Sequence, residues 1–198
     1  VPKTYLPNYN EFYEERHFSS GFEGEAYVRF PDGSFAPMSV NFLFTAQGFE
    51  ELTVACEICE DVWVADPPST HHAQRGAAVI VNLSASNETI GKREYRKTLL
   101  SSQSGRNVCA YVYADAGMYE STSDMVFAGN SMIYENGTLL AESAPFSGEV
   151  CEAELDVDFL LAERRRLNTF KTCYERGSQG SYFWTKDGFW TGELPGLR

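Results

Sequence analysis

A long polar segment between two apolar runs is the feature that most constrains how this chain can fold. Residues 77–83 and 109–114 are mostly apolar runs of strand length, and residues 88–107 between them have helical length and several Lys and Arg side chains. A shorter helix is expected from Pro67-Pro68 to Gly76, where glycine suits a C-cap. This alternation of strands and helices favours a sheet covered by helices.

Shorter β-forming segments lie on both sides of this centre. We expect strands at residues 25–30, 39–45, 52–58, 125–127, 131–134, 139–142 and 149–157. The turn residues Pro31-Asp32-Gly33 join the first two, and Asn136-Gly137 suits a hairpin. Helices are expected at 11–18 and 158–167. Together these elements indicate a layered α+β architecture, with helices on one sheet face and a second sheet on the other.

Charge and cysteine usage limit the classes of partner. A net charge of −12 argues against binding nucleic acid or an anionic membrane, where Lys and Arg must neutralise phosphates. No apolar run approaches the roughly 18–20 residues that span a bilayer. Five cysteines, an odd number without a secretory signal, favour reduced thiols and a cytoplasmic location. The chain opens at Val1 without an initiator Met, which we interpret as the start of a fragment.

One cysteine lies where a nucleophile could stand. Cys59 directly follows the mostly apolar segment 52–58 and precedes two acids, Glu60 and Asp61. The backbone N–H groups of such a turn can point at an oxyanion while the thiol stands clear of the sheet. The neighbouring acids disfavour a thiolate, so Cys59 needs a cation nearby. Lys3, in a loop bounded by Pro2 and Pro7, is the candidate cation, and Glu11 could hold it in place.

The same residues allow other interpretations. Cys59 could be a small core residue and Lys3 a surface lysine. The Cys56-x-x-Cys59 pair could bind zinc or cycle as a dithiol, but zinc needs a second Cys/His pair, and His71-His72 are adjacent rather than spaced. A serine nucleophile is disfavoured because the chain has no Gly-x-Ser-x-Gly elbow.

Taken together, the lysine and cysteine motifs resemble the nitrilase, or carbon–nitrogen hydrolase, superfamily, which uses a Glu–Lys–Cys triad. More narrowly, the chain is similar to the glutaminase domains of glutamine-dependent NAD synthetases in the content and order of its motifs up to about residue 175. These motifs are Lys3–Glu14, Glu57–Trp63, Asn82–Asn87 with Gly91-Lys92, Ala110–Tyr113, Glu120–Asp124 and Gly137–Ser143.

The resemblance implies a fold and a domain division. It predicts a four-layer αββα sandwich of the nitrilase type, present here as a partial domain. Residues 1–175 would be the C-terminal part of the carbon–nitrogen hydrolase domain, and 176–198 a tail or linker toward a synthetase domain. The family's general-base glutamate lies upstream of the lysine motif, so the piece alone is expected to be inactive. ATP and Mg²⁺ are expected only in the synthetase domain, with no cofactor in this one.

The resemblance also implies roles for individual residues. Cys59 would attack the side-chain amide of glutamine, Lys3 with a turn amide near Glu60 would stabilise the oxyanion, and Glu11 would orient Lys3. The residues expected to bind glutamine are Tyr9, Glu60, Trp63 through its backbone, Ser86 and Lys92. Rival interpretations make Glu60 a turn-capping acid and Ser86 the N-cap of the long helix.

Two other functions remained open. The chain could belong to another amidase of the nitrilase superfamily, although the Ser84–Ser86 segment with Gly91-Lys92 favours the glutamine enzyme. It could also be an inactive assembly module that associates through the apolar strand 109–114 and the aromatic residues of the tail, Phe183, Trp184, Phe189 and Trp190. The expected partners are glutamine, the synthetase domain of the same chain and further copies in a homo-oligomer.

Overall fold

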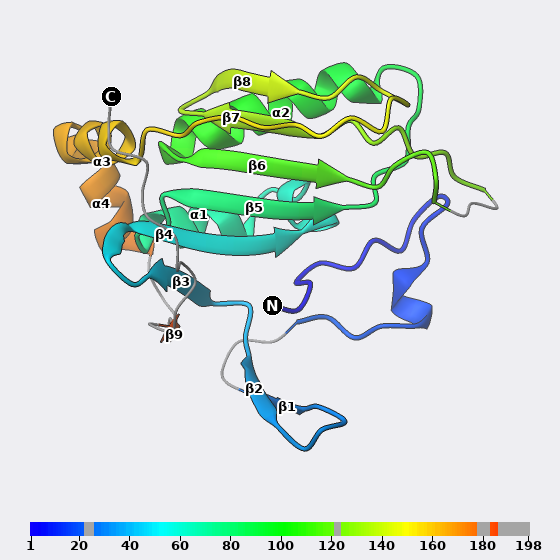
Figure 1. Ribbon diagram of the computed structural model, residues 1–198, viewed down its shortest axis with the longest axis horizontal. Helices are drawn as coiled ribbons and strands as arrows, with labels where there is room; N and C mark the ends of the chain where they lie inside the picture. Colours follow the sequence, from blue (N-terminus) through cyan, green and yellow to red (C-terminus); the bar gives the residue numbers. More distant parts are fainter. Residues whose placement is uncertain (22–25, 121–123, 178–182, 186–198) are drawn as a thin grey trace.

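The computed structural model describes residues 1–21, 26–120, 124–177 and 183–185. Its centre is a seven-stranded mixed sheet in the order β8-β7-β6-β5-β4-β3-β9 (Figure 1). The strands are β3 (Phe42–Ala46), β4 (Phe49–Ile58), β5 (Val79–Ser84), β6 (Ala110–Asp115), β7 (Met132–Glu135), β8 (Thr138–Glu142) and β9 (Phe183–Thr185). Because β4, β5 and β6 run parallel, their carboxyl ends meet at one edge of the sheet.

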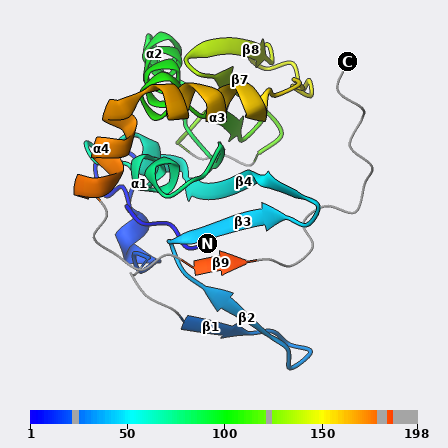
Figure 2. The same cartoon turned by 90° about the vertical axis from the view of Figure 1, so that its left-hand side faces the viewer.

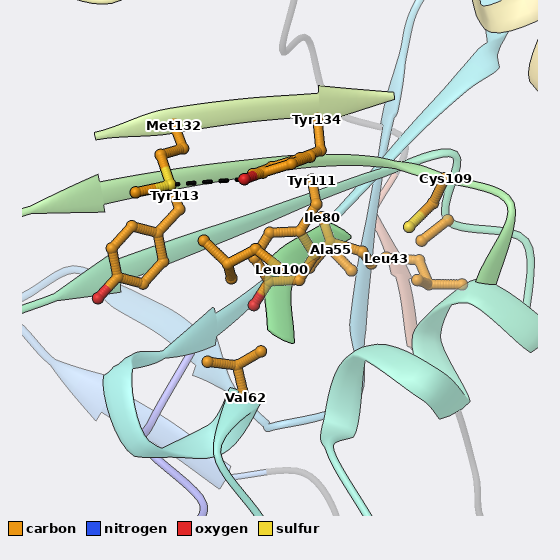
Figure 3. Packing of buried hydrophobic residues seen from close by; sticks show 11 residues of the cluster. Leu43, Ala55, Val62, Ile80, Leu100, Cys109, Tyr111, Tyr113, Met132 and Tyr134 are labelled. Atoms are coloured by element: carbon orange, nitrogen blue, oxygen red, sulfur yellow. Dashed lines mark hydrogen bonds between the residues drawn. The ribbon is translucent and has the colours of Figure 1, made fainter. Parts of the chain in front are cut away.

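Two helices connect the parallel strands and cover one face of the sheet. These are α1 (Pro68–Gln74), after β4, and α2 (Lys92–Asn107), after β5. The register places Ile80 beside Tyr111, and both pack with Leu100 of α2 in one buried cluster (Figure 3). Fully burying side chains of this size stabilises the fold by about 1.5–3 kcal/mol each, so this cluster fixes α2 against the sheet.

The opposite face carries a second, smaller cluster. Strand residues alternate in direction, so Val79 and Ala110 point away from α2 and pack with Leu160 of α3 (Val157–Arg166). The next helix, α4 (Asn168–Gly177), contacts both α3 and α1, so the two helices wrap around the end of the sheet where β5 and β6 begin (Figures 1 and 2). The site-bearing carboxyl edge lies at the other end.

A two-stranded hairpin lies apart from the main sheet. It consists of β1 (Ala26–Arg29) and β2 (Phe35–Met38), and it projects away from the sheet (Figures 1 and 2). Asp32 accepts hydrogen bonds from the N–H and hydroxyl of Ser34, which closes the turn. The predicted turn at 31–33 is therefore confirmed, but it joins β1 to β2 and not to the strand that follows.

The α+β class is confirmed, and within the described residues one sheet and its helices account for two layers of the expected sandwich. None of the described helices is long and apolar enough to cross a bilayer. Part of the predicted tail joins the sheet, because β9 pairs in parallel with β3. Residues 121–123 of one family motif and the tail residues Phe189 and Trp190 lie outside the described residues.

Several predicted elements were wrong in detail. The segment 149–156 is not a strand, since Gly148 at φ 68° turns the chain before it and Asp156 already caps α3. Residues 125–127 make only an isolated bridge from Phe127 to Asn87. The expected helix at 11–18 is a single 3₁₀ turn, η1 (Glu14–Arg16). Helix α4 was not predicted.

Candidate active site

Cys59 lies at the carboxyl end of β4, at the first position of the 3₁₀ helix η2 (Cys59–Val62). Its φ of 49° is in the left-handed region, which is uncommon for a residue other than glycine. The strand must turn abruptly here to enter η2. The Cys59 N–H donates a hydrogen bond of 3.1 Å to the Asn82 side-chain oxygen on β5, so the neighbouring strand holds the nucleophile turn.

The lysine loop is fastened to this turn by a buried carboxylate. Asp61 is 1% exposed, and its oxygens accept hydrogen bonds from the N–H groups of Thr4 at 3.1 Å, Tyr5 at 2.8 Å and Ile58 at 2.9 Å. Burial raises the pKa of Asp61, and the three N–H donors oppose that rise. This single side chain therefore brings the start of the chain to the end of β4.

Gly21 fixes the other side of the lysine loop. Its N–H donates to the Lys3 carbonyl at 2.5 Å. A Cβ at this position would lie 2.8 Å from that carbonyl oxygen and 2.6 Å from Val40, so a larger residue would displace the loop. Lys3 then lines a cavity of about 710 Å³ that Cys59 and Ser84 also line.

The Lys3 ammonium is held by Glu14 and not by Glu11. The distance from Lys3 Nζ to Glu14 Oε2 is 2.5 Å, and both side chains are partly buried. Glu11 instead accepts a hydrogen bond from the Asn87 side-chain amide. The expected Glu11–Lys3 contact was therefore wrong. A turn precedes η1, in which the Phe12 N–H donates to the Tyr9 carbonyl. Because of this turn, Glu11 lines one cavity and Glu14 lines another.

The electrostatics around the Cys59 thiol favour the neutral form at rest. Burial raises its pKa, while the Lys3 charge and hydrogen bonds from the Ala85 N–H and the Ser84 hydroxyl lower it. Lys3 therefore supplies the positive charge that partly offsets the cost of burying a thiolate. The two acids after Cys59 had led us to expect such a cation near the thiol.

A second, smaller cavity is also lined by Cys59. Its volume is about 230 Å³. Every residue predicted to bind glutamine lines it, together with Cys59 and Glu11: the full lining is Tyr9, Asn10, Glu11, Phe12, Cys59, Glu60, Trp63, Ser86, Asn87, Thr89 and Lys92. The structure thus brings the predicted site residues together, with Lys3 in the adjoining cavity and Cys59 shared by both.

Opposite charges line this smaller cavity. Glu60 accepts a 2.7 Å hydrogen bond from the Tyr9 hydroxyl; burial and then this bond raise the pKa of Tyr9. Lys92 donates to the Asn87 side-chain oxygen at 2.5 Å, and its Nζ lies 5.2 Å from the Trp63 ring centre, within cation–π range. Burial lowers the pKa of Lys92, and Arg96 lowers it further.

The Ser86 hydroxyl is a free polar group at this cavity. Ser86 is 2% exposed, and its Oγ has no hydrogen-bond partner within the described part of the chain. Neither Ser86 nor Asn87 caps α2, which begins after Gly91 at φ 82°. The N-cap interpretation of Ser86 was therefore wrong. The Trp63 N–H is engaged by the Glu60 carbonyl at 2.8 Å within η2, and its ring stacks on Tyr95.

A buried ion network supports the Ser86 segment, and sequence reasoning missed it. Arg96 is fully buried and donates to Asp115 at 3.2 Å and to Glu88 at 2.6 Å. Asp115 in turn accepts from the Ser86 N–H at 2.9 Å. Burial raises the pKa of Asp115 to about 6, against the Ser86 N–H and Arg96, which lower it. The network could have been suspected from the sequence because Asp115 directly follows the predicted apolar strand that forms most of β6. Its place in the sheet is beside Ser84 of β5, close to Ser86.

Metal binding finds no support among the described residues. They contain no group of three or more His, Cys, Asp or Glu side chains that could hold a metal ion. Cys56 and Cys59 are both free thiols.

The sheet, its two crossover helices and a cysteine at the end of β4 define the fold of a carbon–nitrogen hydrolase of the nitrilase type. A carbon–nitrogen hydrolase from Helicobacter pylori G27 superposes with a TM-score of 0.62 at 18% identity, over 83% of this chain and 54% of that chain. No protein-family model matches the sequence.

Within this class the chain is similar to glutamine-dependent NAD(+) synthetases. That of Mycobacterium bovis is 45% identical over 172 residues, which are 86% of this chain and 25% of the relative. The crystal structure of the Cytophaga hutchinsonii enzyme gives a TM-score of 0.62 at 26% identity, over 76% of this chain and 23% of that chain. The resemblance stated from the motifs is confirmed. The chain spans about a quarter of the length of the curated relatives it matches.

Proposed function

We propose that this chain carries the glutamine-hydrolysing centre of a glutamine-dependent NAD synthetase. The observation that carries the proposal is the position of Cys59 between two cavities, one with Lys3 and the other with Glu60 and Lys92. A nucleophile, a cation for the oxyanion and a charged recognition pocket are what hydrolysis of an amino-acid side-chain amide requires. The names of the relatives support glutamine as that amino acid.

Glutamine would lie in the smaller cavity. Its α-ammonium group would face Glu60, its α-carboxylate would face Lys92, and the unpartnered Ser86 hydroxyl would form a further hydrogen bond. Opposite charges on the two walls discriminate a zwitterion from a simple aliphatic amide, because an uncharged ligand would enter the cavity without a charge to pair with either Glu60 or Lys92.

In the reaction, the Cys59 sulfur forms a bond to the side-chain amide carbon, and the carbonyl electron pair moves onto oxygen. Lys3 and the backbone amide of Glu60 would stabilise this oxyanion, since the Cys59 N–H is already bound to Asn82. The C–N bond then breaks, and the amine leaves as ammonia with the thiol proton. Water attacks the thioester carbon, which releases glutamate and restores the thiol.

The ammonia would serve the amidation of nicotinic acid adenine dinucleotide in a synthetase domain of the same chain. In this proposal ATP and Mg²⁺ act only in that domain, and the residues described above work without a cofactor. The names of the relatives, and the quarter of their length that the chain spans, are consistent with such a second domain.

The experiment is a Cys59→Ala substitution in the full-length protein. Glutamine-dependent NAD formation should be abolished, and ammonia-dependent formation should be retained. Cys56→Ala is the matched control and should keep most of both activities, since Cys56 lies within β4 and away from either cavity lining. Loss of both activities in Cys59→Ala would make Cys59 a structural residue, and faster hydrolysis of aliphatic amides than of glutamine would favour the alternative amidase.

A further inference from the structure

A buried carboxylate beneath the nucleophile has no part in the chemistry above. Glu57 lies two positions before Cys59 on β4 and is 1% exposed. One of its oxygens accepts a hydrogen bond from the Tyr111 hydroxyl, and the other accepts from the Ser69 N–H at 2.8 Å. Burial raises its pKa to about 7, and these two donors oppose the rise. Burying a carboxylate costs free energy even when it is hydrogen-bonded, and a well-packed apolar residue would avoid that cost.

The hydrogen bonds from Glu57 lead to the nucleophile through two residues. The Asn82 amide nitrogen donates to the Tyr111 hydroxyl at 3.1 Å, and the Asn82 oxygen accepts from the Cys59 N–H at 3.1 Å. Asn82 and Tyr111 are both fully buried, on β5 and β6. We call Glu57, Tyr111 and Asn82 the buried polar chain.

The direction of every bond in this chain is fixed from its ends. The Cys59 N–H can only donate, so Asn82 must present its oxygen to Cys59 and its NH₂ to Tyr111. The Tyr111 hydroxyl then accepts from Asn82 and must donate its proton to Glu57. The Ser69 N–H also only donates, so Glu57 must accept at both oxygens. The ionised form of Glu57 meets that demand, whereas the neutral acid or an amide would turn a donor toward Tyr111 or Ser69.

We propose that the buried polar chain positions Cys59, by holding its N–H so that the residue stays in the left-handed conformation that places its sulfur between the two cavities. A residue other than glycine at φ 49° persists only where its surroundings hold it there. The inference rests on the proposed function only where glutamine turnover is measured. The position of Cys59 can also be followed without glutamine, by the reaction of its thiol with a small alkylating agent.

The test uses two single-atom changes and one matched control in the full-length protein. Tyr111→Phe removes the central hydroxyl, and Glu57→Gln replaces one acceptor oxygen without changing size. Tyr134→Phe is the control, because this tyrosine belongs to the same buried cluster but its hydroxyl donates to the Met132 sulfur, at 3.7 Å, and not to a residue of the buried polar chain (Figure 3). All three changes alter a single polar atom of a buried side chain.

Two rates are measured per folded molecule. The first is kcat and KM for glutamine hydrolysis, normalised to Cys59 sites titrated to completion. The second is the rate constant for alkylation of Cys59 by iodoacetamide, followed on its peptide by mass spectrometry. We expect kcat to fall about 100-fold in Tyr111→Phe and Glu57→Gln, with KM within about threefold, because a small misplacement of a reacting atom has that effect. Alkylation should slow as the sulfur moves away from Lys3, and Tyr134→Phe should match the wild type.

Unchanged kcat per titrated site and unchanged alkylation in both variants would overturn the proposal, even if their melting temperatures fall. The buried polar chain would then contribute only to the stability of the fold. If one of the two variants does not fold, the same two rates are measured on the other variant and test the proposal. If neither variant folds while Tyr134→Phe does, a purely positional role of the buried polar chain is overturned. A wild type that hydrolyses no glutamine, combined with slower alkylation in the variants, would reject the proposed function and leave the positioning of Cys59 supported.

Discussion

Asp61 accepts a 2.8 Å hydrogen bond from the backbone N–H of Tyr5, a residue fifty-six positions earlier in the chain. The same carboxylate accepts from Ile58, next to the candidate nucleophile. One buried side chain thus joins the loop that carries Lys3 to the turn that carries Cys59. The alignment of cation and sulfur therefore depends on this contact.

Asp61→Asn should separate the lysine loop from the nucleophile turn. The new amide nitrogen would face backbone N–H donors, so one or more of these bonds is lost, at about 1–3 kcal/mol of unfolding free energy. Glutamine-dependent turnover should fall about 100-fold, and ammonia-dependent turnover should be retained. Denaturant titration and the two rates measure this. Asp66→Asn is the control, since the Asp66 side chain is 68% exposed, and a normal glutamine rate in Asp61→Asn would reject the role.

The two glutamates of the lysine loop should give different kinetic defects. Glu14→Gln weakens the ion pair with Lys3, so kcat should fall with little change in KM, in the direction of Lys3→Ala, for which the loss of an oxyanion partner lowers turnover about 100- to 1000-fold. Glu11→Gln should mainly raise KM, because Glu11 reaches Lys92 through Asn87. Steady-state kinetics with glutamine measure kcat and KM for both variants. A lower kcat in Glu11→Gln together with a higher KM in Glu14→Gln would restore Glu11 as the partner of Lys3.

Glutamine binding should weaken in acid through Asp115. Burial raises the pKa of this carboxyl to about 6, so it gains a proton as the pH falls through that value. The neutral form binds Arg96 and the Ser86 N–H less strongly, so KM for glutamine should rise between pH 7 and 5. Asp115→Asn should start with a raised KM and lose this part of the pH dependence. An identical pH profile of KM in the variant would exclude Asp115 as its source.

Glu142 should stabilise the fold at neutral pH and lose that effect in acid. Burial tends to raise its pKa, but bonds from Lys97, Arg93 and Asn130 outweigh burial and lower it from 4.5 to about 2. A lowered folded-state pKa gives stability that is present above about pH 4.5 and is lost as the pH falls toward 2. With solvent screening the effect should be about 1–3 kcal/mol.

Denaturant unfolding of Glu142→Gln measures this contribution. The variant should be less stable than the wild type at pH 7, and the difference should shrink at pH 3. Glu152→Gln, a change at an exposed acid before α3, serves as the control. A difference that is equal at both pH values would mean that packing, and not the charge on Glu142, stabilises this end of α2.

Local patterns predicted the central elements well and the peripheral ones poorly. The strands around Ile80 and Tyr111 were predicted because their apolar runs are long and bounded by turn residues. The segment 149–156 also alternates, but it pairs with none of the strands in the described part of the chain and stays irregular. Helix α4, which contacts both α1 and α3, was missed although its apolar residues recur at helical spacing.

The sequence alone determined which residue types meet at the site. Cys59 after an apolar strand, Lys3 between two prolines and the residues of the smaller cavity could be named from local order and from the family resemblance. Tertiary structure decided which partner each of them has: Glu14 rather than Glu11 for Lys3, Asp61 for the lysine loop, and Asn82 for the Cys59 N–H. These contacts join segments far apart in the chain. Their geometry follows from the directions of the parallel strands and the turns at their ends, which no local pattern of residues specifies.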